Sequence, residues 1–215
     1  LAMSGKTVIA YSIANFLTLR CLEQIRNDAV YHNLNINLVS SGGGYTYGVL
    51  GMSHHATEDL SVLNCIPGIT IVAPSTKWET KEALIKLLKI NGTTYLRLEK
   101  YASDLIPYNK KYVLGNLNIY AKGSKLAIIC IGGIFSECMK AVEILKKNGL
   151  KISLYSMSSL KPIDEKKLIK NLKRYSYIMT VEENNFLGGL GSTIASIINK
   201  YSINCIHESV STNDK

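Results

Sequence analysis

The sequence predicts an α/β protein made of two doubly wound domains, each with a mainly parallel sheet. Two observations predict this class. Short apolar or β-branched runs alternate with longer segments of helical spacing, and the connections between them are short. The alternation is interrupted once, by a stretch rich in Tyr, Asn, Lys and Gly at 99–124, and then resumes. We therefore expect one domain over residues 1–98, a linker over 99–124 and a second domain over 125–215.

The first half is expected to begin with a buried strand, because apolar and β-branched residues fill 6–12. A helix follows over 16–31, where apolar residues recur at helical spacing. In 34–39 apolar residues alternate with Asn35 and Asn37. A central parallel strand is apolar throughout, so we expect this strand to lie near an edge of its sheet or to face a wet cleft.

The rest of the first half continues the alternation. A helix near 58–65 is stopped by a Pro-Gly pair, and a strand at 69–72 ends before Pro74. The next helix, 76–89, starts with Thr and Glu at the spacing of a capping box. An Asn-Gly turn then leads into a strand at 94–98.

The second half repeats this layout without detectable repetition of sequence. A short strand is expected within the linker at 111–114. Further strands are expected at 126–131, 152–155 and 177–181, and helices at 135–147, 164–173 and 191–200.

Composition excludes several classes of protein. The chain has 25 Lys and Arg against 16 Asp and Glu, but the lysines are scattered and no basic patch interleaves with stacking aromatics, so we expect no nucleic-acid partner. No apolar run has membrane length, so we expect no membrane partner. The five cysteines are widely spaced, and no pair has metal-ligand spacing. We expect reduced, buried thiols, a cytoplasmic protein and no metal site on this chain.

The most informative stretch is the glycine-rich loop that leaves the strand at 34–39. It holds five glycines within 42–51, and His54 and His55 stand at its far end, just before a helix start. Glycine lets a ligand approach the backbone, and a helix start presents free N–H groups and a positive dipole end. We therefore expect one of the two imidazoles to meet an oxygen-rich ligand.

Several spaced motifs resemble the transketolase family. The first half carries EQIRND at 23–28, GMSHHATEDL at 51–60, IPG at 66–68 and VAP at 72–74, which resemble the thiamine-pyrophosphate pyrimidine domain of transketolases. The second half carries SLKPID at 159–164, TVEEN at 180–184 and GGLG at 188–191, which resemble the transketolase C-terminal domain. The similarity covers nearly the whole chain, and it is strongest to the small subunits of split transketolases.

The resemblance implies an enzyme subunit or C-terminal half that transfers a two-carbon ketol unit from a ketose to an aldose. It implies thiamine diphosphate as cofactor, with Mg²⁺ held mainly by a partner. That partner is a large transketolase-like subunit carrying the diphosphate-binding domain, so the chain is expected to work as a dimer or another homo- or hetero-oligomer. The substrate is expected to be a phosphorylated or nucleotide-linked sugar.

The resemblance also assigns site residues. An aromatic ring stacks on the pyrimidine in this family; Phe16 is the candidate, although an ungapped register puts Leu17 there. His54 matches a residue that contacts donor oxygens and takes part in catalysis, and His55 is a weaker candidate for substrate contact, with capping or packing as its alternative. Lys100 stands where an arginine binds the substrate phosphate, and its alternative is a solvated linker lysine.

Other matching residues are expected to be structural. Glu182, Glu183 and the glycine turn at 188–191 invite an acid–base interpretation, but the family places them in the C-terminal domain, away from the chemistry. We therefore expect a structural or interfacial role for them.

The sequence also departs from the family pattern. The glutamate that activates the aminopyrimidine is expected upstream of Leu1. Val49 and Leu50 replace an acidic pair that reads donor hydroxyls, and glycines 42–44 replace a phosphate-binding histidine. These changes leave the sugar open. They also leave two alternatives to the ketol transferase open. One is a related thiamine diphosphate enzyme, of the deoxyxylulose-phosphate-synthase or keto-acid type, and the other is a non-catalytic scaffold subunit with a decayed site.

Overall fold

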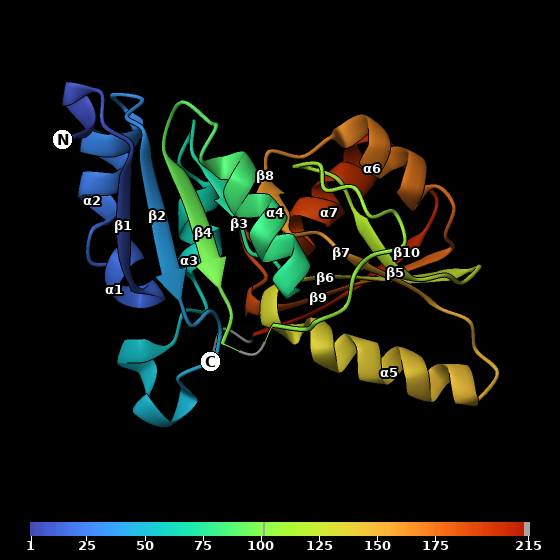
Figure 1. The fold of residues 1–215 in the computed structure, drawn as a ribbon. Coiled ribbons are helices and arrows are strands. Elements are labelled where there is room, and N and C mark those ends of the chain that lie inside the picture. The colour runs from blue at the N-terminus through green and yellow to red at the C-terminus, as the bar shows by residue number, and fades with distance from the viewer. Residues whose placement is uncertain (101, 213–215) are drawn as a thin grey trace.

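The computed structural model describes residues 1–100 and 102–212, and it arranges them around two five-stranded sheets (Figure 1). The first sheet has the order β1 (Val8–Ile13), β2 (Ile36–Ser41), β4 (Thr94–Leu98), β3 (Thr70–Val72) and β8 (Ser159–Lys161). The second has the order β10 (Ile206–Thr212), β9 (Tyr177–Asn185), β6 (Leu126–Ile131), β7 (Ser153–Ser156) and β5 (Asn118–Ala121). Two pairings, β3 with β8 and β5 with β7, are antiparallel and the others are parallel, which confirms the predicted fold class.

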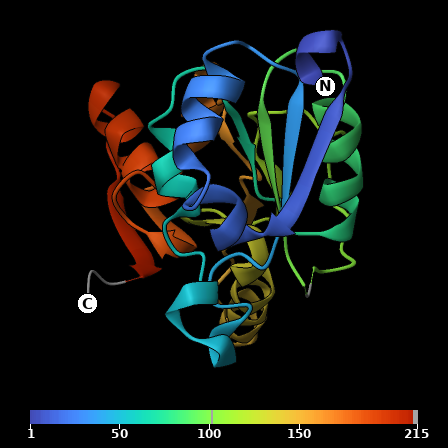
Figure 2. The ribbon, with the colours of Figure 1, turned by 90° about the vertical axis from the view of Figure 1, so that its left-hand side faces the viewer.

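Helices cover both faces of each sheet. In the first half they are α1 (Ala14–Thr18), α2 (Leu22–Gln24), a π-helical turn (Ile25–Val30), α3 (Asp59–Asn64) and α4 (Lys77–Leu87). The second half has α5 (Phe135–Lys147), α6 (Glu165–Leu172) and α7 (Leu190–Lys200). Short 3₁₀ turns occur at Ala2–Ser4, Gly48–Leu50, Met52–His54 and Gly132–Ile134. Figure 2 shows α1, α2 and α3 on one face of the first sheet and α4 on the other.

Alternation along the strands divides the core into layers. Ile71 in β3 and Ile129 in β6 belong to one apolar cluster that also takes in Leu60 of α3 and Ile194 of α7. Neighbouring residues point the other way: the next residue of β3, Val72, packs in a separate cluster with α4. Because the largest cluster draws on both sheets, the two halves share one continuous core.

Several predicted elements need correction. The strand expected at 111–114 is wrong, because the linker instead forms β5 later, at Asn118–Ala121, and Tyr112 packs under α4 with its hydroxyl 3.0 Å from Ser158 Oγ. The helix expected over 16–31 is broken after Thr18 and ends in the π-helical turn. Besides β5, two further strands were not predicted at all. β8 has only three residues, and β10 alternates exposed and half-buried residues at the sheet edge.

The polar pattern of 34–39 has a local explanation. β2 lies one strand in from the edge, between β1 and β4. Asn37 is buried, and its Oδ1 accepts a hydrogen bond of 2.8 Å from Thr94 on β4. The polar side chain is therefore satisfied by a cross-strand partner rather than by water.

The cysteine and membrane predictions are partly tested. All five cysteines are free; Cys130 and Cys138 are buried, but Cys65 is exposed, so the expectation of uniformly buried thiols is wrong for it. In the part of the chain that the structure describes, no helix is long and apolar enough to cross a membrane.

A buried ion cluster lies at the carboxyl end of β4. Arg97 is fully buried, and its guanidinium bonds Asp59 of α3 and Glu99 at 3.1 Å each. Tyr95 donates a further 2.6 Å hydrogen bond to Asp59. Burial lowers the pKa of Arg97, but the carboxylates of Asp59 and Glu99 outweigh burial and hold that pKa above its ordinary value. The cluster is therefore charged and internally paired.

Two glycine turns close on this arginine, one from each half. A Cβ added to Gly43 would lie 2.3 Å from Arg97 Nε, and one added to Gly132 would lie 2.7 Å from Arg97 Nη2. Gly132 also has a φ of +72°, which strains any residue with a side chain. Arg97 therefore fixes the start of the glycine-rich loop and the turn after β6 against each other.

Glu182 stabilises the start of α7 through hydrogen bonds to its backbone. Its carboxylate accepts hydrogen bonds from the backbone N–H groups of Leu190 at 2.8 Å and Gly191 at 2.7 Å. Burial raises the pKa of Glu182 to about 7, although these two bonds and Arg97 oppose the shift. The geometry agrees with the structural role expected for this residue.

We predict that Arg97→Met lowers the free energy of unfolding by roughly 3–5 kcal/mol, because it leaves two carboxylates buried without their partner. Lys140→Met is the matched control: Lys140 bonds Glu137 at 2.7 Å, but both side chains are exposed, so a change of at most ~0.5 kcal/mol is expected. Urea unfolding measures both. A loss for Arg97→Met no larger than that of the control would contradict a central role for the cluster.

A second prediction concerns pH. The folded-state pKa of Glu182, about 7, lies above its ordinary value of 4.5, so the protonated form is favoured by folding. Its contribution to stability is complete below pH 4.5 and is lost as the pH rises through about 7. Between pH 5 and 8 the wild type should lose on the order of 2 kcal/mol relative to Glu182→Gln. A stability difference between the two proteins that stays constant over this range would refute the assignment.

Candidate functional site

Two segments meet beyond the carboxyl edge of the first sheet. One is the junction of β1 and α1, and the other is the loop 42–58 between β2 and α3. Asn15 Nδ2 donates a 2.6 Å hydrogen bond to the backbone oxygen of Ser53, and the rings of Phe16 and His54 meet edge to face with centroids 5.1 Å apart. In open α/β sheets ligands bind in the crevice outside the carboxyl ends of the strands. This junction is therefore the candidate site.

Glycines give the loop its shape. Gly42 and Gly44 have φ values of +82° and +55°, and Gly44 forms an isolated bridge with Ala56 through two backbone bonds of 2.9 and 3.0 Å. This bridge closes the base of the loop. Between its ends the chain projects away from the sheet as two short 3₁₀ turns, visible as the cyan segment below the first sheet in Figure 1. The tip exposes three apolar side chains, Val49, Leu50 and Met52.

His54 lies at the inner end of this projection and is half-buried. Its Nδ1 is 3.0 Å from Ser53 Oγ, and its ring contacts Phe16. Among residues 1–100 and 102–212 no hydrogen-bond partner of Nε2 is found, so this nitrogen can meet a ligand. The structure thus brings together two of the predicted site residues, Phe16 and His54.

His55 has a different environment. Its Nε2 is 3.2 Å from the backbone oxygen of Gly48, and its ring contacts Tyr45 edge to face with centroids 5.1 Å apart. Both partners belong to the loop itself. These contacts brace the loop and correspond to the packing alternative considered for this residue.

The two candidates for pyrimidine contact, Phe16 and Leu17, differ in how deeply they are buried. Leu17 is 9% exposed and packs in the large core cluster with Ile25 and Leu60. Phe16 is half-buried, with the guanidinium of Arg20 4.6 Å from its ring centroid. Arg20 is exposed, so its side chain can move from the ring without leaving a buried charge. Of the two side chains, Phe16 is the one that a planar ring can reach.

Lys100 lines a cavity of about 250 Å³ beside the loop. The same cavity is lined by Tyr45 and Thr46 of the loop, by Glu99, and by Gly133 and Glu183 of the second half. Burial raises the pKa of Glu183, and the neighbouring Glu99 raises it further, while Arg97 opposes them. Lys100 therefore shares its cavity with two carboxyl groups.

The sequence did not point to several residues that shape this site. Asn15 anchors the backbone of Ser53, and Ser53 in turn contacts His54. Glu183 packs so closely on the loop that a Cβ on Gly44 would lie 2.5 Å from Glu183 Cβ. The two adjacent acids at 182 and 183 could have pointed to this part of the site. Only the fold shows that Glu182 accepts hydrogen bonds from the start of α7, whereas Glu183 faces the loop.

A metal centre is not formed by these groups. In the described part of the chain, no three or more His, Cys, Asp or Glu side chains gather as they would around a metal ion.

The chain matches two family models and several known proteins. The family model of the transketolase pyrimidine binding domain matches residues 1–103, and that of the transketolase C-terminal domain matches residues 115–212. A Methanocaldococcus jannaschii protein described as a putative transketolase C-terminal section is 34% identical over 207 residues, covering 95% of this chain and 65% of that protein. An apulose-4-phosphate transketolase subunit from Actinobacillus succinogenes is 31% identical over 199 residues, covering 92% of this chain and 64% of that protein.

A solved structure is also similar. A split gene transketolase, described as an inactive beta4 tetramer, superposes with a TM-score of 0.87 at 26% identity and covers 99% of this chain and 68% of that one. The chain thus spans about two thirds of the length of the relatives it matches. Two domain models that together account for nearly all its residues, and a fold shared over its whole length, lead to one conclusion: the chain belongs to the transketolase family and carries its pyrimidine-binding and C-terminal domains.

Proposed function

We propose that this chain supplies the pyrimidine-facing wall of a thiamine diphosphate site, and that the assembled enzyme transfers a two-carbon ketol unit from a ketose to an aldose. The proposal rests on the contact between the rings of Phe16 and His54 at the carboxyl edge of the first sheet. One residue offers an aromatic face and the other a proton donor and acceptor. Phe16 stands beside the loop 42–58 and His54 belongs to it, and the apolar tip of this loop projects from the sheet.

The residues present fit the cofactor that the family implies. Thiamine diphosphate, when bound, supplies the carbanion chemistry of ketol transfer. Phe16 would stack on the aminopyrimidine ring, and offset or edge contacts between aromatic rings contribute roughly 0.5–1.5 kcal/mol beyond area burial. The backbone of Ser53, held by Asn15, keeps the neighbouring His54 ring in place. The chain thus contributes a preorganised wall rather than a flexible loop.

His54 is the proposed acid–base residue. An imidazole can donate or accept a proton near neutral pH, which suits contacts with sugar hydroxyl oxygens. Ser53 Oγ next to Nδ1 orients the ring, so that Nε2 faces the ligand. His55 is proposed to act indirectly, by bracing the loop through Gly48 and Tyr45.

A partner is proposed to complete the site. Val49, Leu50 and Met52 at the loop tip are exposed, and so are Ile9 and Tyr11 on the edge strand β1. Exposed apolar groups on neighbouring segments are typical of a surface that another polypeptide covers. We propose that this polypeptide is a large transketolase-like subunit or domain that binds the diphosphate and Mg²⁺, and that the enzyme is a homo- or hetero-oligomer.

The sugar is proposed to be phosphorylated or nucleotide-linked, with Lys100 near its anionic group. Lysine provides one point charge where arginine would provide a planar pair of donors, so its hold on a phosphate is less directional. Glu99 and Glu183 line the same cavity and would repel a terminal phosphate that entered deeply. A phosphate at the mouth of this cavity, close to Lys100, fits these charges best.

We predict that His54→Ala lowers kcat of the complex by about 100-fold, the usual size of an acid–base contribution, without changing cofactor affinity. The complex is assembled with the large subunit, thiamine diphosphate and Mg²⁺, and ketol transfer is followed by product formation. His32→Ala is the matched control, because His32 is exposed and contacts Tyr31 rather than the site.

The same assay separates the alternatives. Equal turnover in wild type and His54→Ala would remove His54 from the mechanism. Carbon dioxide release from an α-keto acid by the complex would instead favour the decarboxylating type of thiamine enzyme. A complex that assembles but shows neither reaction would support the scaffold alternative.

A second prediction distinguishes Phe16 from Leu17. Phe16→Ala should weaken thiamine diphosphate binding by up to about tenfold through loss of stacking, with little loss of stability. Leu17→Ala should leave cofactor affinity nearly unchanged but lower the free energy of unfolding by roughly 2–5 kcal/mol, because Leu17 lies in the core. Calorimetric titration of the assembled complex and urea unfolding of each variant measure the two effects. The reverse pattern would assign the pyrimidine contact to Leu17.

A further inference from the structure

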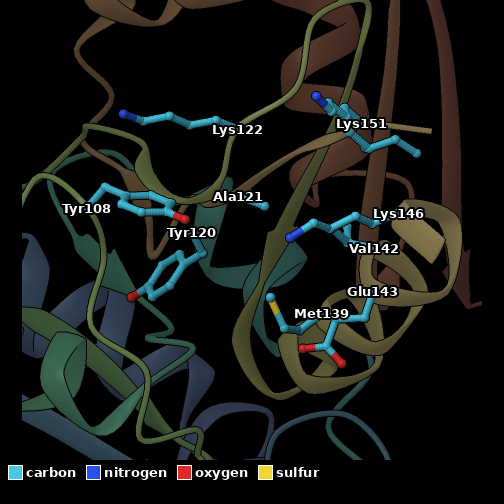
Figure 3. A pocket seen from close by; sticks show the side chains of 10 residues that line it. Tyr108, Tyr120, Ala121, Lys122, Met139, Val142, Glu143, Lys146 and Lys151 are labelled. Atoms are coloured by element: carbon cyan, nitrogen blue, oxygen red, sulfur yellow. The ribbon is translucent and has the colours of Figure 1, made fainter. Parts of the chain in front are cut away.

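A second cavity lies in the C-terminal domain, between β5 and α5 (Figure 3). Its volume is about 350 Å³, which is within the range of small-molecule pockets. None of its lining residues belongs to the loop 42–58 or to the cavity at Lys100. Tyr120, Met139, Val142 and Ile152 give it an apolar and aromatic lining.

Three lysines are among the lining residues, and each comes from a different segment. Lys122 follows β5, Lys146 lies in the last turn of α5, and Lys151 precedes β7. In Figure 3 Lys146 extends from α5 across the cavity toward the strand that carries Tyr120 and Ala121. Within residues 1–100 and 102–212, none of the three has a carboxylate at ion-pair distance. Glu143 is the one acid among the lining residues.

The floor of the cavity is held in place. The ring of Tyr120 meets Phe135 with centroids 4.6 Å apart, and its hydroxyl donates a 2.9 Å hydrogen bond to the buried Glu79. On the rim, Lys122 Nζ lies 5.1 Å from the ring centroid of Tyr108. A fixed aromatic floor bordered by lysines suits a flat apolar group that carries a concentrated negative charge.

We propose that this cavity binds a small phosphomonoester with a flat, apolar body. The phosphate dianion would lie between Lys146 and Lys151, and the body would lie against Tyr120 and Val142. Two lysines that line one cavity favour a dianion over a singly charged carboxylate, because each added charge contact strengthens binding. The body would contact Tyr120, whose hydroxyl contacts both Glu79 and Thr76 of the first half, and the ligand would lie apart from the cavity at Lys100.

Phenyl phosphate is the probe, because it combines a phosphate dianion with a planar apolar ring, and phenol is the uncharged counterpart. The full chain, ¹⁵N-labelled, is titrated with each and followed by NMR. Phenyl phosphate should bind saturably and shift the amide signals of Val142 and Ile152. The double variant Lys146→Gln, Lys151→Gln should raise its Kd at least about tenfold, as expected for two charge-assisted contacts.

Lys147→Gln is the matched control. Lys147 is the next residue of α5 and carries the same charge, but it does not line the cavity, so its Kd should stay within about twofold of the wild type. Three results would overturn the proposal: equal weakening by Lys147→Gln and by the double variant, phenol binding as tightly as phenyl phosphate, or no saturable binding up to ~10 mM probe.

Discussion

The buried guanidinium of Arg97 is the interaction on which the arrangement of this molecule depends. It joins β4 to the first turn of α3 through Asp59, and Gly43 and Gly132 approach it from opposite halves. A charge inside a protein is tolerated only when it is fully paired, so each neighbouring segment has little freedom to shift. The glycines follow from the same constraint, because a side chain at either position would collide with the arginine. Gly43 is therefore required by packing around Arg97, whereas Gly42 and Gly44 have positive φ values and lie against Tyr47 and Glu183.

The position of the candidate site follows from this cluster. The loop 42–58 starts beside Arg97 and ends at Asp59, so both of its ends are tied to one ion cluster, and the Gly44–Ala56 bridge closes its base. Its middle can then project from the sheet and still present His54 to Phe16 at a defined distance. Glu183, from the second domain, packs on Gly44. The C-terminal domain thus supports the wall of the site, although the proposed chemistry lies with the first domain.

The sequence predicted the regular elements better than their junctions. Strands at 94–98 and 126–131 and the helix at 135–147 have the predicted bounds, because period and composition mark them locally. β8 could not be foreseen, since three residues of the second half add antiparallel to the first sheet. The sequence did not distinguish Arg97 from other strand residues, because its partner Asp59, 38 residues away, is brought to it only by the fold. His54 was found through its motif, whereas Asn15 and Glu183 act through contacts that no spacing in the sequence reveals.

An experimental structure of the chain assembled with its large subunit, thiamine diphosphate and Mg²⁺ would test the proposed site. The aminopyrimidine ring should lie against Phe16, with ring centroids about 4.5–7 Å apart, and His54 Nε2 should face the reacting end of the cofactor. Val49, Leu50 and Met52 should be covered by the partner. A pyrimidine ring bound elsewhere on this chain, or a loop tip that stays in solvent while the cofactor is bound, would rule out the proposed site.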